Sequence, residues 1–231
     1  MRQRLANGGV PKSRTVSTIY DCGVPDARQA GLAAAASCVR VGRLVVMPTD
    51  TVYGLGCDAF DPAAVRNLLS VKGRGPSMPV PVLVGSWTTV DGLVLGVPRH
   101  ARTLIEAFWP GGLSIVLAHA PSLAWDLGES RGTVMLRMPL HPVALELLRD
   151  IGPMAVSSAN RSGQPPATTA AEAKRQLADD VPVYLDGGPC DEPVPSTIVD
   201  LTGSDPLLLR EGAVTADQVS EVLGIAVPLA R

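Results

Sequence analysis

Short apolar segments of strand length are the feature of this sequence that most constrains its fold. They recur along the chain, each closed by proline, glycine or polar residues, and helical patterns separate only some of them. The expected strands are 44–47, 80–84, 115–118, 133–137, 154–156, 196–201 and 207–210, and the expected helices are 26–40, 62–72, 101–108, 142–149 and two that begin near Thr169 and Thr215. Because several strands follow one another directly, the pattern favours a mixed α/β sheet with packed helices.

The chain is expected to form one compact domain over residues 26–231, after a polar N-terminal leader at 1–25. Its 231 residues contain no repeat, low-complexity tract or linker. No apolar run reaches about 18 residues and no signal-type segment is found, so a soluble, cytoplasmic protein without a membrane span is expected. Four widely spaced cysteines form no C-x-x-C pair, which predicts reduced thiols and no zinc site: Cys22, Cys38, Cys57 and Cys190.

Composition weakens one class of function. The formal net charge is -2 and aromatic residues make up 3% of the chain. A protein held on nucleic acid mainly by net charge, or one that stacks single-stranded bases, would have more basic or more aromatic residues. A local basic cleft remains compatible with these values.

Lys72 is the most informative single residue. It continues the apolar stripe of helix 62–72, at i+7 from Val65 and i+4 from Leu68, and Arg74 follows closely. One interpretation is a lysine that snorkels from the helix end and satisfies its last carbonyls. The other is a phosphate clamp, in which lysine gives a point charge and arginine a bidentate fork.

Two polar segments follow expected strands. Residues 48–56 form a glycine-punctuated loop rich in hydroxyls, and residues 157–163 combine serine and amide groups with little steric bulk. Ligands of open α/β sheets bind beyond the strand ends, and such groups suit phosphate or ribose. Ordinary capping turns or solvated loops remain the alternative, since neither segment is a Walker loop.

Two arginines occupy apolar strand patterns. Arg137 interrupts strand 133–137 at its end, and Arg210 closes strand 207–210. Each alone could be an edge cation, but together with Lys72 and Arg74 they indicate a pocket for a ligand with several negative charges. Three histidines show no metal-ligand spacing and are expected to be structural or surface residues: His100, His119 and His141.

The chain resembles the YrdC-like family, also called TsaC, the threonylcarbamoyl-AMP synthases. Seven segments match in family order, between about residue 28 and residue 222. They are 48–56 (PTDTVYGLG), 72–74 (KGR), 108–112 (FWPGG), 133–139 (TVMLRMP), 157–163 (SSANRSG), 195–200 (PSTIVD) and 209–212 (LREG). The resemblance implies a single YrdC-like α/β domain around a twisted sheet with a concave cationic cleft.

The resemblance also implies an activity. Such a nucleotidyltransferase, an L-threonylcarbamoyladenylate synthase, forms threonylcarbamoyl-AMP and pyrophosphate from ATP, L-threonine and bicarbonate, with Mg2+ assisting. A downstream threonylcarbamoyl transferase complex then uses the product to modify the tRNA adenosine next to the anticodon. Whether the chain itself contacts tRNA stays open at this stage.

The resemblance assigns roles residue by residue. Catalytic roles fall to Lys72 and Arg74, and no protein metal ligand is expected. The expected ATP contacts are Arg74, Thr133, Asn160, Thr168 and Arg210, and the expected threonine contacts are Thr51, Arg137, Ser158 and Ser196. The chain departs from the usual pattern at Met78, where many members have lysine or asparagine, and at Gly75, where proline is common.

Two other functions remain as alternatives. One is a YrdC-like module that handles a carbamoyl-adenylate for a different acceptor. The other is an RNA-binding module that uses the concave cleft without chemistry, which the composition makes less favourable. Pyrophosphate release that requires threonine and bicarbonate would separate the synthase from a binding module, which releases none, and the product formed from ATP, bicarbonate and mixed amino acids would be the most useful single observation.

Overall fold

One mixed β-sheet organises the molecule. The computed structural model describes residues 16–75, 78–123, 125–190 and 194–230. Within these residues ten strands form a single sheet in the order β1-β8-β2-β3-β7-β4-β6-β5-β9-β10. The strands are β1 Thr18–Asp21, β2 Val45–Met47, β3 Gly54–Asp58, β4 Val82–Leu83, β5 Leu113–Ala118, β6 Thr133–Arg137, β7 Met154–Ser158, β8 Val183–Asp186, β9 Thr197–Asp200 and β10 Leu207–Arg210. Parallel and antiparallel pairs both occur, which confirms the predicted mixed sheet.

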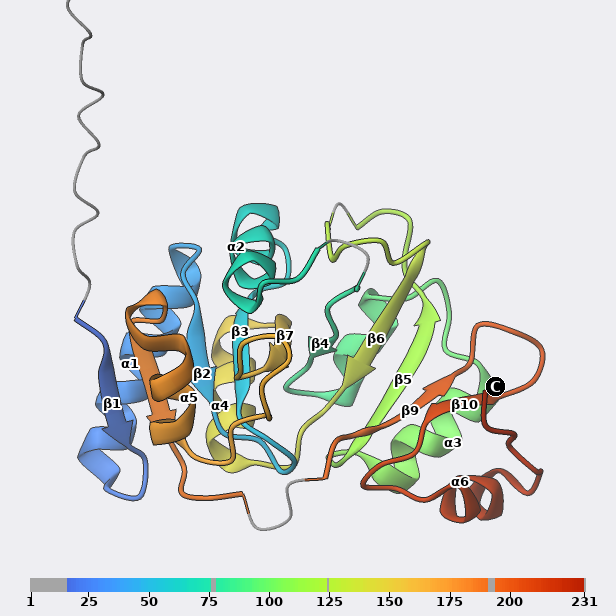
Figure 1. The fold of residues 1–231 in the computed structure, drawn as a ribbon. Coiled ribbons are helices and arrows are strands. Elements are labelled where there is room, and N and C mark those ends of the chain that lie inside the picture. The colour runs from blue at the N-terminus through green and yellow to red at the C-terminus, as the bar shows by residue number, and fades with distance from the viewer. Residues whose placement is uncertain (1–15, 76–77, 124, 191–193, 231) are drawn as a thin grey trace, which may run out of the picture.

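Six α-helices and two short 3-10 helices accompany the sheet in the described part of the chain. The helices are α1 Pro25–Arg40, α2 Pro62–Lys72, α3 Arg99–Phe108, α4 Pro142–Ile151, α5 Ala170–Leu177 and α6 Ala216–Leu223, with 3-10 helices η1 Trp87–Gly92 and η2 Ala178–Asp180. Figure 1 shows the twisted sheet running from β1 at one side to β10 at the other. Helices α1 and α4 pack together at the β1 end, and α3 and α6 pack together at the β10 end.

The sheet separates two apolar clusters. Val45 belongs to the cluster that α1 and α4 cover, and its neighbour Val46 belongs to the cluster with α2, α3, α5 and α6. This is the expected alternation of side chains along a strand. Helix α1 contacts β1, β8, β2 and β3 and packs against α4. On the β6-β5-β9-β10 half, the same face of the sheet carries the polar residues described below.

The ends of α2 follow the sequence closely. The side chain of Asp61 caps the helix by accepting hydrogen bonds from the backbone N–H groups of Ala63 at 2.8 Å and Ala64 at 3.1 Å. Gly73 ends it in the left-handed conformation, with φ of 67°, which glycine adopts without steric cost. Lys72 is therefore fixed as the last residue of a well-capped helix.

The expected loop at 48–56 is wrong in its second half, because Gly54–Asp58 forms strand β3. Gly54 and Gly56 read as loop punctuation, yet in the structure they permit close packing. A Cβ on Gly54 would lie 2.7 Å from the Val156 side chain, and one on Gly56 would lie 2.8 Å from that of Met154. Glycine in a strand marks such a close approach.

Two further strands were not expected. Thr18–Asp21, inside the predicted leader, forms edge strand β1 and pairs in parallel with β8, which the sequence analysis also missed. Both are only four residues long. Strand β1 is largely exposed and carries little apolar signal, whereas the first three residues of β8 are buried. The rest of the predicted leader, residues 1–15, lies outside the described residues. In the described chain no helix is long and apolar enough to cross a membrane.

Candidate functional site

Lys72 is fully buried and points at the end of β7. Its Nζ donates to the backbone carbonyl of Ser158 at 2.6 Å and to the Oδ1 atom of Asn160 at 2.9 Å, and it lies 3.2 Å from Ser158 Oγ. These partners are neutral oxygens, and no carboxylate pairs with Lys72 in the described residues. A buried lysine normally has a charged partner, so this cation has hydrogen bonds but no compensating charge.

Burial sets the charge state of Lys72. Removal from water, which is the larger cause, and the nearby positive charge of Arg74 together lower the pKa of Lys72 from its usual 10.5 to about 7. Arg74 donates from Nη1 to Ser157 Oγ at 3.4 Å, and its buried Nε has no hydrogen-bond partner among the described residues. The two basic side chains predicted as catalytic therefore lie together beside β7.

Arg137, at the end of β6, has a different environment. Its guanidinium donates to Thr51 Oγ1 at 2.9 Å, to Asp50 Oδ1 at 2.7 Å and to the Gly111 carbonyl at 2.9 Å. The Arg137 and Asp50 side chains are 8% and 16% exposed, so the ion pair is mostly buried. Burial lowers the pKa of Arg137, the Asp50 carboxylate opposes this, and the charge of Arg210 adds to it.

A continuous chain of contacts joins Lys72 to Arg137. Ser158, which Lys72 contacts, pairs with Gly54 at the start of β3. The loop before Gly54 carries Thr51, and Thr51 accepts the hydrogen bond from Arg137. The structure therefore brings together residues predicted for the phosphate side and for the threonine side, from α2, β3, β6 and β7.

Arg210 and Ser196 form a third part of this region. Arg210 donates to the Ser196 carbonyl from Nε at 3.0 Å and from Nη2 at 2.7 Å, and its Nη2 lies 3.2 Å from Ser196 Oγ. Ser196 Oγ is also 3.0 Å from Ser114 Oγ. Ser196 was predicted for threonine and Arg210 for ATP, and the structure places both at the junction of β9 and β10.

Thr133 lines a cavity beside this region. This cavity has a volume of about 220 Å³ and lies over β6, β5, β9 and β10. Its lining residues are Pro79, Val80, Val116, Leu127, Ser130, Thr133, Val134, Met135, Asp200 and Leu209. Thr133 Oγ1 donates to the Ser130 carbonyl at 2.7 Å, so its lone pairs remain able to accept.

The other two predicted ATP contacts have structural hydrogen bonds. Asn160 is 4% exposed and donates from Nδ2 to the carbonyls of Arg161 and Gln164, while its Oδ1 accepts from Lys72. The backbone N–H and hydroxyl of Thr168 both donate to Glu172 Oε2 at the start of α5. A direct nucleotide contact from either would require these bonds to be exchanged.

Sequence reasoning missed several residues that complete the region. Asp50 lies inside the quoted segment 48–56, but it pairs with a residue 87 positions further along the chain, Arg137, so no local signal indicates the pairing. Ser114 and Asp200 also lie inside strands, where alternation puts them on the same face as the predicted Ser196. That period-2 pattern was the one signal that could have identified them.

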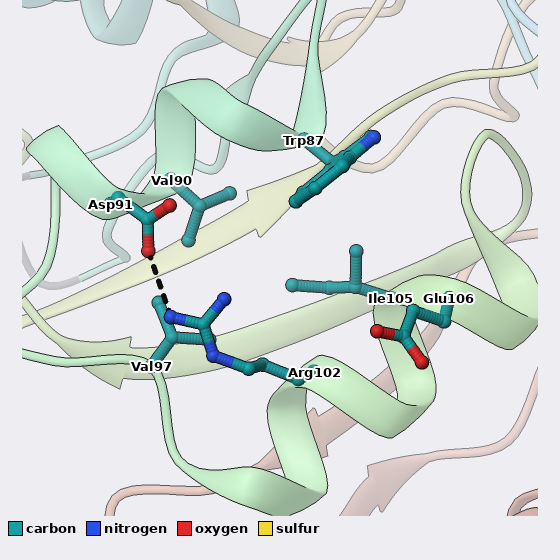
Figure 2. A pocket seen from close by; sticks show the side chains of 7 residues that line it. All are labelled: Trp87, Val90, Asp91, Val97, Arg102, Ile105 and Glu106. Atoms are coloured by element: carbon teal, nitrogen blue, oxygen red, sulfur yellow. Dashed lines mark hydrogen bonds and ion pairs between the residues drawn. The ribbon is translucent and has the colours of Figure 1, made fainter.

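A second cavity is not part of this region. Figure 2 shows it between η1 and α3, lined by Trp87, Val90, Asp91, Val97, Arg102, Ile105 and Glu106. Arg102 donates to Asp91 at 3.2 Å within it. Its volume of about 20 Å³ is room for little more than one water molecule, and none of the predicted site residues lines it.

The fold and this region define a class: an α/β domain with buried basic side chains gathered at a polar part of one twisted sheet. The chain belongs to the Sua5/YciO/YrdC family, whose model, described as telomere recombination, matches residues 37–212. That match confirms the resemblance found in the sequence.

Named relatives agree with the family. A Mycobacterium tuberculosis protein provisionally named threonylcarbamoyl-AMP synthase is 61% identical over 206 residues, covering 89% of this chain and 95% of its own length. The Bacillus subtilis threonylcarbamoyl-AMP synthase is 37% identical over 84% of this chain and 56% of its own. The structure of Sua5 from P. abyssi complexed with L-threonine superposes with a TM-score of 0.86 at 32% identity, covering 94% of this chain and 63% of that one. The chain thus spans about three fifths of the solved Sua5 protein.

Proposed function

We propose that this protein is an L-threonylcarbamoyladenylate synthase, a nucleotidyltransferase that forms threonylcarbamoyl-AMP and pyrophosphate from ATP, L-threonine and bicarbonate. The observation that carries the proposal is the buried Lys72, which lies beside Arg74 and has only neutral oxygen partners in the described residues. A polyphosphate would supply the charge that these basic groups lack. The names of the relatives, and the L-threonine complex of one of them, support the same assignment.

The chemistry explains why basic groups are needed. The carbamate of threonine is an anionic nucleophile, and it must attack the α-phosphorus of a nucleotide that is itself anionic. Lys72 and Arg74 offset this repulsion and the charge that develops on the leaving pyrophosphate. No covalent intermediate on the protein is required, since holding the two substrates in line supplies much of the acceleration.

Arg137 serves the threonine side in this proposal. Its guanidinium is held in place by Asp50 and Thr51, and an arginine fork suits a carboxylate. The hydroxyls of Thr51, Ser158 and Ser196 are the groups proposed to recognise the threonine side chain and amino acid backbone.

The nucleotide side comprises Arg74, Thr133, Asn160, Thr168 and Arg210 in this proposal. Mg2+ is proposed to arrive on the ATP phosphates, as part of the substrate. The described residues contain no group of three or more histidine, cysteine or acidic side chains that could hold a metal ion. Mg2+ commonly keeps its waters and binds substrate phosphates.

The proposed product, threonylcarbamoyl-AMP, needs a downstream enzyme that uses it. A separate threonylcarbamoyl transferase complex, which transfers the group to the tRNA adenosine next to the anticodon in the cytoplasm, completes the proposal. The formal charge of -2 gives the chain no general attraction for nucleic acid, so a tRNA contact would have to be local.

Product analysis tests the proposal. The protein is incubated with ATP, bicarbonate and a mixture of amino acids, and the adenylates are identified by mass spectrometry. Threonylcarbamoyl-AMP should dominate and valine should be rejected strongly, because a site that hydrogen-bonds a hydroxyl discriminates against the analogue without it. Equal turnover of valine and threonine would sink the threonine assignment, and a carbamoyl-adenylate without threonine would favour the related module.

A further inference from the structure

The large cavity has a nearly apolar wall with one carboxylate in it. Met135 of β6, Val116 of β5, Asp200 of β9 and Leu207 of β10 are consecutive cross-strand neighbours. Side chains in register point to the same face of a sheet, so this row crosses one face of four strands. Met135, Val116 and Asp200 all line the cavity.

The same face carries the candidate site. Thr133, Met135 and Arg137 alternate along β6, so they share a face, and Arg137 lies about 7 Å beyond Met135 at the usual rise of a strand. The face is polar near Arg137 and apolar at the cavity. A ligand with an apolar planar part and a charged part would place the planar part in the cavity and the charged part near Arg137, Arg210 and Lys72.

Asp200 is the acidic side chain of this wall, and only one of its two carboxylate oxygens has a hydrogen-bond partner in the described residues. Its Oδ1 accepts hydrogen bonds from the backbone N–H of Thr202 at 2.9 Å and from Thr202 Oγ1 at 2.7 Å. Within the described chain Oδ2 has no hydrogen-bond partner. Asp200 is only half-buried and Oδ2 is not among the buried atoms, so it is open to water, and a ligand that displaces this water has to offer a donor in its place.

We propose that Asp200 is a specificity-determining residue, which selects a purine nucleotide with a 6-amino group by accepting a hydrogen bond from that amine at Oδ2. The proposal rests on the proposed use of ATP and adds the part of the site that reads the base. A 6-oxo purine presents an acceptor at the same position, and two acceptors facing each other in a cavity repel. The cavity therefore discriminates against ITP and GTP.

The test uses Asp200→Asn in the full chain. The asparagine Oδ1 keeps the bonds from Thr202, and its amide N–H₂ puts a donor where Oδ2 was. Asp205→Asn is the matched control, because Asp205 is exposed in the loop after β9 and does not line the cavity. Binding of ATP and of ITP, each with Mg2+, is measured by calorimetry for the wild type and both variants.

The wild type should bind ATP more tightly than ITP, and Asp200→Asn should reduce that preference about ten- to a hundredfold by weakening ATP and strengthening ITP. Asp205→Asn should keep the wild-type ratio. Equal loss of both nucleotides in Asp200→Asn, an unchanged ratio, or a wild type that binds ATP and ITP equally would overturn the role of Asp200 while leaving ATP as a substrate. A wild type that binds neither nucleotide would overturn the proposed function itself.

Discussion

Two buried basic side chains, Arg137 and Lys72, lie in the same region but differ in their charged partners. Arg137 has a carboxylate, a hydroxyl and a carbonyl as partners, so its charge is compensated in the ligand-free protein. Lys72 is as well buried but has only neutral oxygens as hydrogen-bond partners, and burial together with the charge of Arg74 lowers its pKa to about 7.

The two side chains should therefore respond differently to a bound anion: Arg137 keeps its charge state, whereas the charge state of Lys72 changes. Arg137 is held by Asp50 and is ready to orient a carboxylate without changing its own charge. Lys72 bears the cost of burial without a counter-charge, so an anion that binds beside it recovers that cost and raises its pKa. Buried charges without partners are unfavourable for folding, and their presence at a proposed phosphate site fits a functional role.

The largest effect is expected from Lys72→Ala. Turnover should fall by about 10²-fold or more, as when one electrostatic stabiliser of a transition state is removed, while the fold is retained. Pyrophosphate release under saturating ATP, threonine and bicarbonate measures it. Lys174→Ala is the control. Lys174 lies on α5, donates to the Ser17 carbonyl and lies over the Tyr184 ring. Near-normal turnover in Lys72→Ala would support the snorkelling interpretation.

For the free energy of unfolding, substitution of Arg137 should have a larger effect than substitution of Lys72. Arg137→Ala leaves Asp50 buried without its partner and should lower the free energy of unfolding by about 3–5 kcal/mol. Lys72→Met removes an uncompensated charge and should cost little or stabilise. Urea denaturation at pH 7 compares the two variants, and Arg137→Met with Asp50→Asn should recover much of the loss. A larger loss in Lys72→Met than in Arg137→Ala would contradict the comparison.

The two arginines should separate the two substrates. Arg210→Ala should weaken an ATP analogue more than threonine, and Arg137→Lys, which keeps the buried charge, should weaken threonine more than the ATP analogue. Each lost charge-assisted bond should cost roughly 1.5–3 kcal/mol, or about ten- to a hundredfold in affinity. Calorimetric titration of both variants measures this, and two identical affinity profiles would favour structural roles for both.

The smallest effect is a pH dependence of stability. Because the pKa of Lys72 is lowered in the folded protein, the unfolded chain binds more protons between about pH 7 and the usual lysine pKa of 10.5. Stability should therefore rise with pH above 7, by at most about 1.4 kcal/mol per pH unit from this group. The difference between wild type and Lys72→Met in urea at pH 7.5 and 8.5 isolates it, and a difference that is flat or falls with pH would show that the lysine is not desolvated.

The sequence predicted the elements whose signals are local. Helix α2 has its cap, its apolar stripe and its terminal glycine within a few residues of one another, and strand β6 was predicted at the bounds that the structure shows. Strand β1 is short and exposed, and its partner β8 is buried but only four residues long. The two pair across most of the chain, so no local signal indicated the pairing.

In the candidate site, too, the residues with a local sequence signal were identified and those without one were not. Lys72 and Arg137 were identified because a basic residue on an apolar stripe or strand is unusual. Asp50 could not be assigned to Arg137 because that pairing depends on how β6 meets the loop before β3. The start of α5 also depends on such detail: Thr169 Oγ1 accepts a hydrogen bond from the Glu172 N–H, whereas the Glu172 carboxylate accepts from Thr168.

Proton uptake on nucleotide binding tests most directly the central claim that burial without a counter-charge lowers the pKa of Lys72 and that a bound phosphate raises it again. ATP with Mg2+ is titrated calorimetrically at pH 8 in two buffers of different ionisation enthalpy. At this pH Lys72 is mostly neutral before binding, so the account predicts uptake close to one proton per ATP, lost in Lys72→Met and kept in Lys174→Ala. ATP binding without proton uptake, or equal uptake in Lys72→Met, would contradict it.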